Sequence, residues 1–185
     1  MNPRLETLHA VEASCWQELQ RAVKARDHGW RQVVLATVGE AGADARTVVL
    51  RDVEVLAREL FFYSDSRAAK VTELLADPRA TLVLWAGHLG WQLRLRCTVE
   101  VLTSGLDVSS RWARLKLTPA ARDYLSPLPP GAPLTPSEPD RASREHFCVL
   151  RARVLSLDWL ELHPDGHRRA RFTAGSEPPW QWLSP

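Results

Sequence analysis

Basic side chains at the start of a predicted helix are the first residues whose types and spacing indicate chemistry. Asp65 and Ser66 can cap a helix over residues 67–76, and Arg67 and Lys70 lie three residues apart on one face of it. Cations at a helix N-terminus oppose the helix dipole, and a bound anion would explain their presence. The free amides of the first turn and the two cations therefore predict a phosphate site. The alternative is a solvated pair beside neighbouring acids.

Lysine is informative in this chain because it is rare. Among the 24 basic residues, only Lys24, Lys70 and Lys116 are lysines. A genomic preference for arginine codons accounts for the many arginines, so the use of lysine at position 70 says more than the use of arginine nearby.

A predicted strand with an arginine at each end is the second candidate site. The period of two places Arg46 and Arg51 on opposite faces of this strand unless a bulge intervenes. Each has apolar neighbours, where a charged side chain needs a partner or a ligand. The alternative is that each arginine extends past the strand end to water.

A third basic run lies near the end of the chain. On a strand, His167, Arg169 and Arg171 project to one side as a row of donors that suits a carboxylate, a phosphate or an electron-rich ring. The alternative is an edge strand protected by charge. His163 and His167 are separated by Pro164 and Gly166, and no Cys or acidic cluster accompanies them, so no metal site is predicted.

Hydrophobic periodicity predicts the elements that must position these groups. Helices are predicted over residues 3–27, 67–76 and 106–116, and a further short helix begins at Thr118 and Pro119. Strands are predicted over residues 31–38, 45–55, 60–63, 80–85, 91–101, 147–162 and 167–173. A Pro-rich loop occupies about residues 126–140. Short turns join most of the strands, which favours antiparallel pairing.

The fold class is therefore mainly β (α+β), an antiparallel closed or split β-barrel with peripheral helices, in a single domain over residues 1–185. The strand over residues 91–101 alternates between apolar and polar residues. Its polar face, with Gln92, Arg94 and Arg96, meets water, a ligand or a partner chain.

Composition excludes several classes of protein. The 185 residues carry a net charge of only +2, which argues against a general nucleic-acid binder, and 45% are hydrophobic, as in a globular core. No run approaches the ~18 apolar residues of a membrane span, and the N-terminus lacks a signal-peptide pattern. The three cysteines form no C-x-x-C pair. We therefore expect a cytoplasmic protein with no membrane or nucleic-acid partner and no metal.

Taken in order, the motifs resemble those of the pyridoxamine 5′-phosphate oxidase-like flavin proteins. They are Arg46–Arg51, Phe62–Asp65, Arg67–Lys70, Trp91–Arg94 and Arg169–Phe172. The resemblance spans roughly residues 31–185. It implies an FMN-binding split barrel that forms a homodimer and holds FMN at the subunit interface.

The resemblance also implies a set of residues that bind the cofactor. The strand with Arg46, Thr47, Val48, Val49, Leu50 and Arg51 would run along the flavin ring. Arg51 and Lys70 would bind the FMN phosphate, with Arg67 assisting. Tyr63 and Ser64 would line the ribityl and phosphate end, Gln92 would hydrogen-bond the flavin, and Arg171 would approach the ring from the partner subunit.

The substrate residues of the oxidase have no clean match in this chain. The segment from Val108 to Arg114 lacks the oxidase's Tyr, Arg and Ser pattern, and the oxidase's Arg-x-His-x-Arg run is shortened to Arg169-Ala170-Arg171. Arg169 is the remaining candidate for substrate binding. The resemblance therefore implies an FMN-dependent oxidoreductase acting on an unidentified small substrate, without a named catalytic base. The alternatives are a genuine pyridoxamine or pyridoxine 5′-phosphate oxidase and a non-catalytic FMN-binding or dimerising module.

Overall fold

An antiparallel β-barrel forms the centre of the molecule in the computed structural model, which describes residues 4–133 and 144–185. Hydrogen bonding follows the strand order β3-β2-β1-β4-β5-β6-β7-β8, and the pairing of β3 with β6 closes six of these strands into the barrel. The strands are β1 Gln32–Gly39, β2 Gly42–Glu54, β3 Glu59–Asp65, β4 Arg79–Ala86, β5 Trp91–Leu102, β6 Phe147–Glu161, β7 Arg168–Thr173 and β8 Trp180–Leu183. The predicted barrel is confirmed.

Apolar and polar residues alternate along the strands, which explains why the inner face of the barrel is buried and the outer face is exposed to solvent. On β5, Leu93 and Leu95 are fully buried inside the barrel, whereas Gln92, Arg94 and Arg96 project outward. The same period-two pattern on β4 buries Leu82 and the residues in phase with it. Polar residues on the outer face are therefore free to meet a ligand or a partner.

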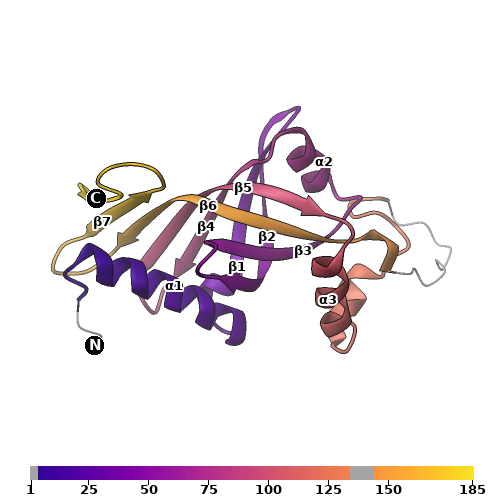
Figure 1. Ribbon diagram of the computed structural model, residues 1–185, viewed down its shortest axis with the longest axis horizontal. Helices are drawn as coiled ribbons and strands as arrows, with labels where there is room; N and C mark the ends of the chain where they lie inside the picture. Colours follow the sequence, from indigo (N-terminus) through magenta and orange to yellow (C-terminus); the bar gives the residue numbers. More distant parts are fainter. Residues whose placement is uncertain (1–3, 134–143) are drawn as a thin grey trace.

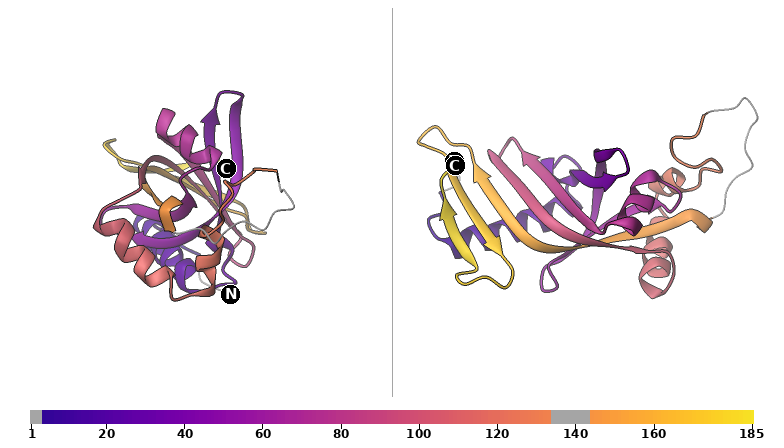
Figure 2. Two further views of the ribbon diagram at one scale, coloured as in Figure 1. Left: turned by 90° about the vertical axis from the view of Figure 1, so that its right-hand side faces the viewer. Right: turned by 90° about the horizontal axis from the view of Figure 1, so that it is seen from above.

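β6 pairs with β5 along one edge and is long enough to pair with two further strands along the other. Its first half, residues 147–153, closes the barrel against β3, and its second half, residues 156–161, pairs with β7. β7 and β8 extend away from the barrel, at the end opposite α2 and α3 (Figures 1 and 2).

β8 was not among the seven predicted strands. Its four residues follow two prolines and are too few to show an alternating pattern. Because β8 pairs with β7, the alternative prediction that the Arg169–Arg171 strand is a charged edge is wrong.

The helices cover the ends and one side of the barrel (Figure 1). α1, Leu8–Lys24, begins at Thr7, whose hydroxyl accepts a hydrogen bond from the Ala10 amide, and it packs against β2 and β8. α3, Leu106–Leu115, and the 3₁₀ helix η2, Pro119–Tyr124, enclose a second, smaller core with Phe61 and Phe147. Short 3₁₀ helices also occur at Gly29–Arg31 (η1) and Arg144–His146 (η3).

α2, Ala69–Ala76, starts later than predicted. The residue before it, Ala68, forms no side-chain cap. The Asp65 carboxylate, predicted to cap the helix, instead accepts hydrogen bonds from the amide and the guanidinium of Arg67.

Two further predictions can be compared with the described residues. Residues 126–133 of the predicted Pro-rich loop contain no helix or strand, and the part from residue 134 lies outside the described residues. Among the described helices, none is long and apolar enough to span a membrane.

Candidate functional site

Alternation along β2 decides which side chains reach the outer face of the barrel, and a β-bulge interrupts it at Arg51. The register of β2 against β3 shifts between Leu50 and Asp52. Val48 and Leu50 are buried in the core, so only their backbone could meet a ligand outside the barrel. Thr47, Val49 and Arg51 are out of phase with these core residues and are exposed or half-buried on the outer face.

Arg51 lies at one end of the outer face of β2 and contacts two tyrosines. Its Nη2 donates a hydrogen bond of 3.0 Å to the Tyr124 hydroxyl, and its guanidinium carbon lies 5.7 Å from the centre of the Tyr63 ring. Its Nε is buried and has no hydrogen-bond partner among the described residues. An orphaned, charged donor at this position is what an anionic or carbonyl-bearing ligand would satisfy.

Lys70, near the start of α2, is a half-buried cation. In the described part of the chain its ammonium makes no hydrogen bond or ion pair. Burial lowers the pKa of Lys70 and the nearby charge of Arg46 lowers it further, which together outweigh the opposite effect of the Asp65 and Glu73 carboxylates. Both effects disfavour a cation in the ligand-free protein, and both would be relieved by a bound anion.

Arg46 is held against α2 by polar contacts. Its guanidinium donates to the Glu73 carboxylate at 2.9 Å, to the Asp44 carboxylate at 2.5 Å and to the Thr37 hydroxyl. Arg46, not Arg51, is therefore the arginine beside Lys70. Arg51 lies five residues further along β2, about 16 Å at ~3.3 Å per residue. The joint binding of one phosphate by Arg51 and Lys70 therefore stays a prediction.

Arg67 and Ser64, two other predicted cofactor residues, have local partners. Arg67 forms an ion pair of 2.7 Å with Asp65 and donates to the carbonyls of Ser126, Pro127 and Leu128. These bonds attach the start of the Pro-rich loop to the barrel. Ser64 is buried, and its hydroxyl donates to the Asp65 carbonyl at 3.2 Å.

The remaining predicted residues lie on the same outer face but on distant strands. Gln92 is on β5, and Arg169 and Arg171 are on β7, where both donate to the Asp158 carboxylate of β6. His167, predicted to join them, lies in the turn before β7 and accepts a hydrogen bond from the His163 amide. Leu50 of β2 aligns through β3 with Leu150 of β6, whereas Arg171 aligns with Asp158 of β6. These two positions of β6 are eight residues apart, about 26 Å at ~3.3 Å per residue, so Arg171 and β2 do not contact the same end of one ligand within one chain.

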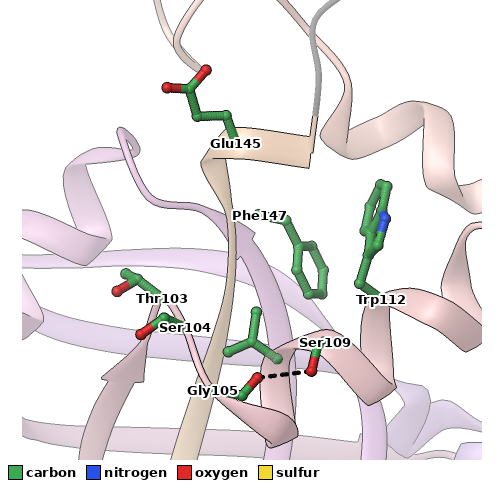
Figure 3. Close-up of a pocket in the computed structure, with 8 residues that line it drawn as sticks. Thr103, Ser104, Gly105, Ser109, Trp112, Glu145 and Phe147 are labelled. Carbon is green, nitrogen blue, oxygen red and sulfur yellow. Dashed lines mark hydrogen bonds between the residues drawn. The ribbon is translucent and has the colours of Figure 1, made fainter.

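Two larger hollows contain none of the predicted site residues. One, of about 220 Å³, lies between the end of β5, α3 and Phe147, and Figure 3 shows the Ser109 hydroxyl hydrogen-bonded to the Gly105 carbonyl at its edge. The other, of about 870 Å³, separates the β1–β2 hairpin from α2. It is lined by Glu40, Asp44, Glu73 and Asp77 and by no basic residue, which makes it unsuitable for a phosphate.

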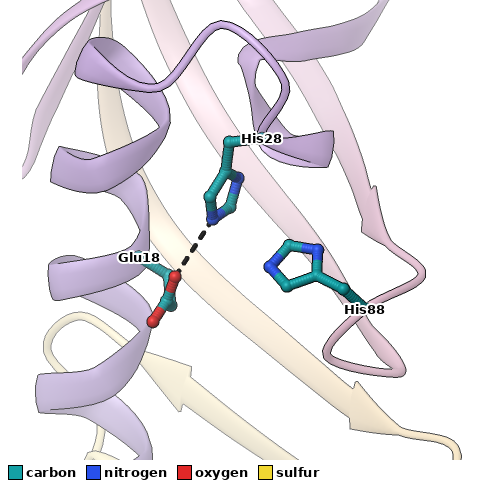
Figure 4. A group of neighbouring side chains, drawn as sticks. All are labelled: Glu18, His28 and His88. Atoms are coloured by element: carbon teal, nitrogen blue, oxygen red, sulfur yellow. Dashed lines mark hydrogen bonds and ion pairs between the residues drawn. The ribbon is translucent and has the colours of Figure 1, made fainter.

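The structure brings together three potential metal ligands that the sequence analysis did not identify: Glu18, His28 and His88 (Figure 4). His28 Nδ1 accepts a hydrogen bond from the Trp30 amide at 3.1 Å, so in the neutral ring Nε2 carries the proton and donates to Glu18 at 3.0 Å. A metal-bound histidine normally donates from its other nitrogen, whereas here that nitrogen is an acceptor. The cluster therefore serves to attach α1 to η1.

The closed six-stranded antiparallel barrel with its two added strands defines a class, the split β-barrels. Residues 13–103 match the model of a family described as pyridoxamine 5′-phosphate oxidase, FMN-binding domain. Through these 91 of its 185 residues, the chain belongs to the pyridoxamine 5′-phosphate oxidase-like FMN-binding family, as the motifs had indicated.

Curated relatives support the same assignment. The chain is 36% identical over 88 residues to the pyridoxine/pyridoxamine 5′-phosphate oxidase of Microcystis aeruginosa, a match that covers 47% of this chain and 40% of the relative. It is 33% identical over 115 residues to the enzyme of that name from Caulobacter vibrioides, covering 60% of this chain and 51% of the relative. The chain thus spans about half or less of the curated relatives that it matches.

Solved structures agree on the fold. A pyridoxamine 5′-phosphate oxidase-related FMN-binding protein from Nostoc punctiforme superposes with a TM-score of 0.76 at 22% identity, covering 99% of this chain and 100% of that one. PhzG from Burkholderia lata, in complex with tetrahydrophenazine-1-carboxylic acid, gives a TM-score of 0.72 at 18% identity, covering 100% and 95%.

Proposed function

We propose that this protein binds FMN as a homodimer and is an oxidoreductase acting on a small substrate. The observation that carries the proposal is Lys70, a half-buried ammonium that lies beside Arg46 and forms no ion pair or hydrogen bond among the described residues. A phosphate is the group that such a site at the start of a helix would bind. Membership of a family of FMN-binding domains supports FMN as its carrier.

The residues present fit the cofactor at both ends. Lys70 would hold the phosphate. The outer face of β2, with Thr47 and Val49, would support the ring, and the orphaned Nε of Arg51 would serve a polar group further along. The sequence analysis expected Arg51 to bind the FMN phosphate. We propose instead that Arg51 contacts the other end of FMN.

A second copy of the chain would complete the site. β7, which contains Arg171, and α2, which contains Lys70, lie towards opposite ends of the molecule (Figure 1), so an arginine of β7 would join the β2 site from a partner subunit. Between β2 and β5 the outer face carries Val34 and Trp85, large apolar side chains that are 40% and 47% exposed. This apolar strip, which lies between the polar residues of β2 and those of β5, favours burial against a partner subunit.

The flavin, when bound, would supply the redox chemistry by accepting a hydride or an electron pair from the substrate. The protein's own contribution would be binding and orientation, through the β2 backbone and Gln92. Positive charge from Arg171 would stabilise negative charge that develops on the ring during reduction.

The test is the visible absorption spectrum of the purified protein after expression with FMN supplied, combined with a titration of FMN into flavin-free protein. We expect a flavin spectrum and saturable binding with one FMN per chain. Absence of both would refute the proposal. Bound flavin that no nicotinamide or amine donor reduces would identify a non-catalytic binding module instead.

A second candidate is pyridoxine or pyridoxamine 5′-phosphate oxidase activity. It is favoured by the curated relatives of that name, although each match covers about half or less of the relative. Formation of pyridoxal 5′-phosphate by the flavin-loaded protein would establish this activity. If the protein binds FMN but forms no pyridoxal 5′-phosphate, the proposed function is that of an FMN-dependent oxidoreductase acting on another small substrate.

A further inference from the structure

A basic hollow lies on the outer face where β5, β6 and β7 run side by side. It has a volume of about 120 Å³ and is lined by Arg94, Arg96, Ser156, Asp158, Arg171 and Thr173. In the antiparallel register, Asp158 is directly opposite Arg94 on one side and Arg171 on the other. Directly opposed residues project to the same face of a sheet, so the register itself brings these three side chains together.

The guanidiniums around Asp158 offer more donors than its carboxylate can accept. Arg94 donates at 3.1 Å, Arg171 at 2.8 and 3.1 Å, and Arg169 through two bonds of 2.9 Å. These five N–H groups already exceed the roughly four lone-pair sites of a carboxylate. The other N–H groups of these arginines have no acceptor among the described residues.

The charge of the hollow is also unbalanced. Its lining has three positive charges, on Arg94, Arg96 and Arg171, against the one carboxylate of Asp158, which leaves an excess of two. Arg169, which does not line the hollow, also pairs with Asp158. Arg96 has no ion-pair partner in the described ranges.

A second hollow, of about 190 Å³, lies further along β5 and β6, and its charges balance. There Arg151 and Arg153 are matched by Glu59 and Glu100. Ion pairs whose role is only to stabilise neighbouring strands require equal numbers of positive and negative charges, as this second hollow has.

We propose that the hollow between β5 and β7 binds an oxyanion, the carboxylate or phosphate of a small molecule. The planar guanidinium, with its fixed fork of donors, matches both groups. The hydroxyls of Ser156 and Thr173 supply further donors at the rim. The hollow is smaller than the ~300–1,000 Å³ of sites that enclose a whole ligand, so it holds a headgroup.

The hollow also adjoins a residue of the proposed flavin site. Gln92 precedes Arg94 by two residues on β5 and projects from the same face. The oxyanion is therefore the acidic group of the substrate to be oxidised or reduced. This last step rests on the proposed function, whereas oxyanion binding by the hollow does not.

The experiment is a calorimetric titration of inorganic phosphate, and separately of succinate, into Lys70→Ala protein, in which the proposed FMN phosphate site is removed. We expect saturable binding of at least one probe. Adding Arg96→Gln should weaken it at least tenfold, the effect of losing a charge-assisted contact of ~1.5 kcal/mol. Because Arg96 is exposed and unpaired, the thermal midpoint should not change.

The matched control is Arg153→Gln in the balanced hollow on the same strands, which should leave anion affinity unchanged. Binding of phosphate alone would identify a phosphate ester as the ligand, and binding of succinate alone a carboxylate. No saturable binding of either probe, or an equal loss with Arg153→Gln, would overturn the proposal. FMN binding is measured separately in wild-type protein, so a failure of the proposed function would be recognised independently.

Discussion

Individual basic side chains in this protein differ in whether their charge is already satisfied. Arg67 and Arg46 have carboxylate partners at 2.5–2.9 Å, whereas Lys70 has none in the described part of the chain and Arg51 keeps a buried Nε without an acceptor. Unsatisfied buried donors reduce stability unless a ligand completes them. Lys70 and Arg51 are therefore the residues near β2 and α2 whose free donors we assign to ligand binding.

Lys70→Ala should weaken FMN binding by about 1.5–3 kcal/mol, roughly ten- to hundredfold, because a charge-assisted contact to the phosphate is lost. The unfolding midpoint of the flavin-free protein should stay the same or rise, since a half-buried ammonium beside Arg46 is removed. Fluorescence titration and thermal unfolding measure the two effects. Lys116→Ala, at an exposed lysine after α3, is the control. Unchanged FMN affinity in Lys70→Ala would show that the phosphate site is misplaced.

The low pKa of Asp158 predicts how the free energy of unfolding depends on pH. Although burial raises its pKa, hydrogen bonds from Arg169, Arg171 and Arg94 outweigh this and lower the pKa of Asp158 to about 2, against an ordinary value of 3.8. The folded state therefore binds this proton less readily than the unfolded state. The resulting stabilisation, on the order of 2 kcal/mol, is fully present above about pH 4 and is lost as the pH falls through about 2.

Urea unfolding of wild type and Asp158→Asn between pH 2 and 5 measures this contribution. The difference in unfolding free energy should be largest at pH 5 and should shrink towards pH 2. A difference that does not vary with pH would mean that the ionised carboxylate is not the source of the stabilisation.

At the scale of elements, the close approach of η1 to the end of β4 positions α1 against the barrel. A Cβ on Gly29 would lie 2.5 Å from the Trp85 carbonyl oxygen and 3.0 Å from the Cα of Ala86, both backbone atoms that cannot move independently. This contact explains why the chain has glycine there without any need for a positive φ.

Gly29→Ala should destabilise the protein by about 1–3 kcal/mol, because the extra methyl group must separate two backbone segments. Gly87→Ala is the control, since a Cβ there would meet its nearest atom at 3.7 Å and the backbone is not in the left-handed region. Chemical unfolding should show a lower midpoint for Gly29→Ala alone. Equal midpoints for the two variants would contradict the close approach.

At the scale of the whole molecule, the proposed flavin site is divided between two ends of one chain. β2 and α2 carry one set of residues and β7 the other, with the apolar strip around Val34 and Trp85 between them. Placing a second copy against this strip would both bury apolar surface and bring the two sets together.

Val34→Asp should therefore reduce the molecular mass measured by light scattering from that of a dimer to that of a monomer, and should weaken FMN binding together with it. An aspartate in the centre of an apolar interface is left without a partner when the interface forms. Leu56→Asp, in the exposed turn between β2 and β3, should change neither property. A wild-type protein that binds FMN as a monomer would refute the shared site.

The sequence by itself determined the fold class, the bounds of most elements and the family, because hydrophobic periodicity and ordered motifs are properties of local segments. It did not show β8, which is too short to carry a pattern. Only the tertiary structure decided that Arg46 rather than Arg51 lies beside Lys70, and that Asp158 gathers arginines from β5 and β7. These neighbours depend on strand register and on packing between segments far apart in the chain, which no local pattern encodes.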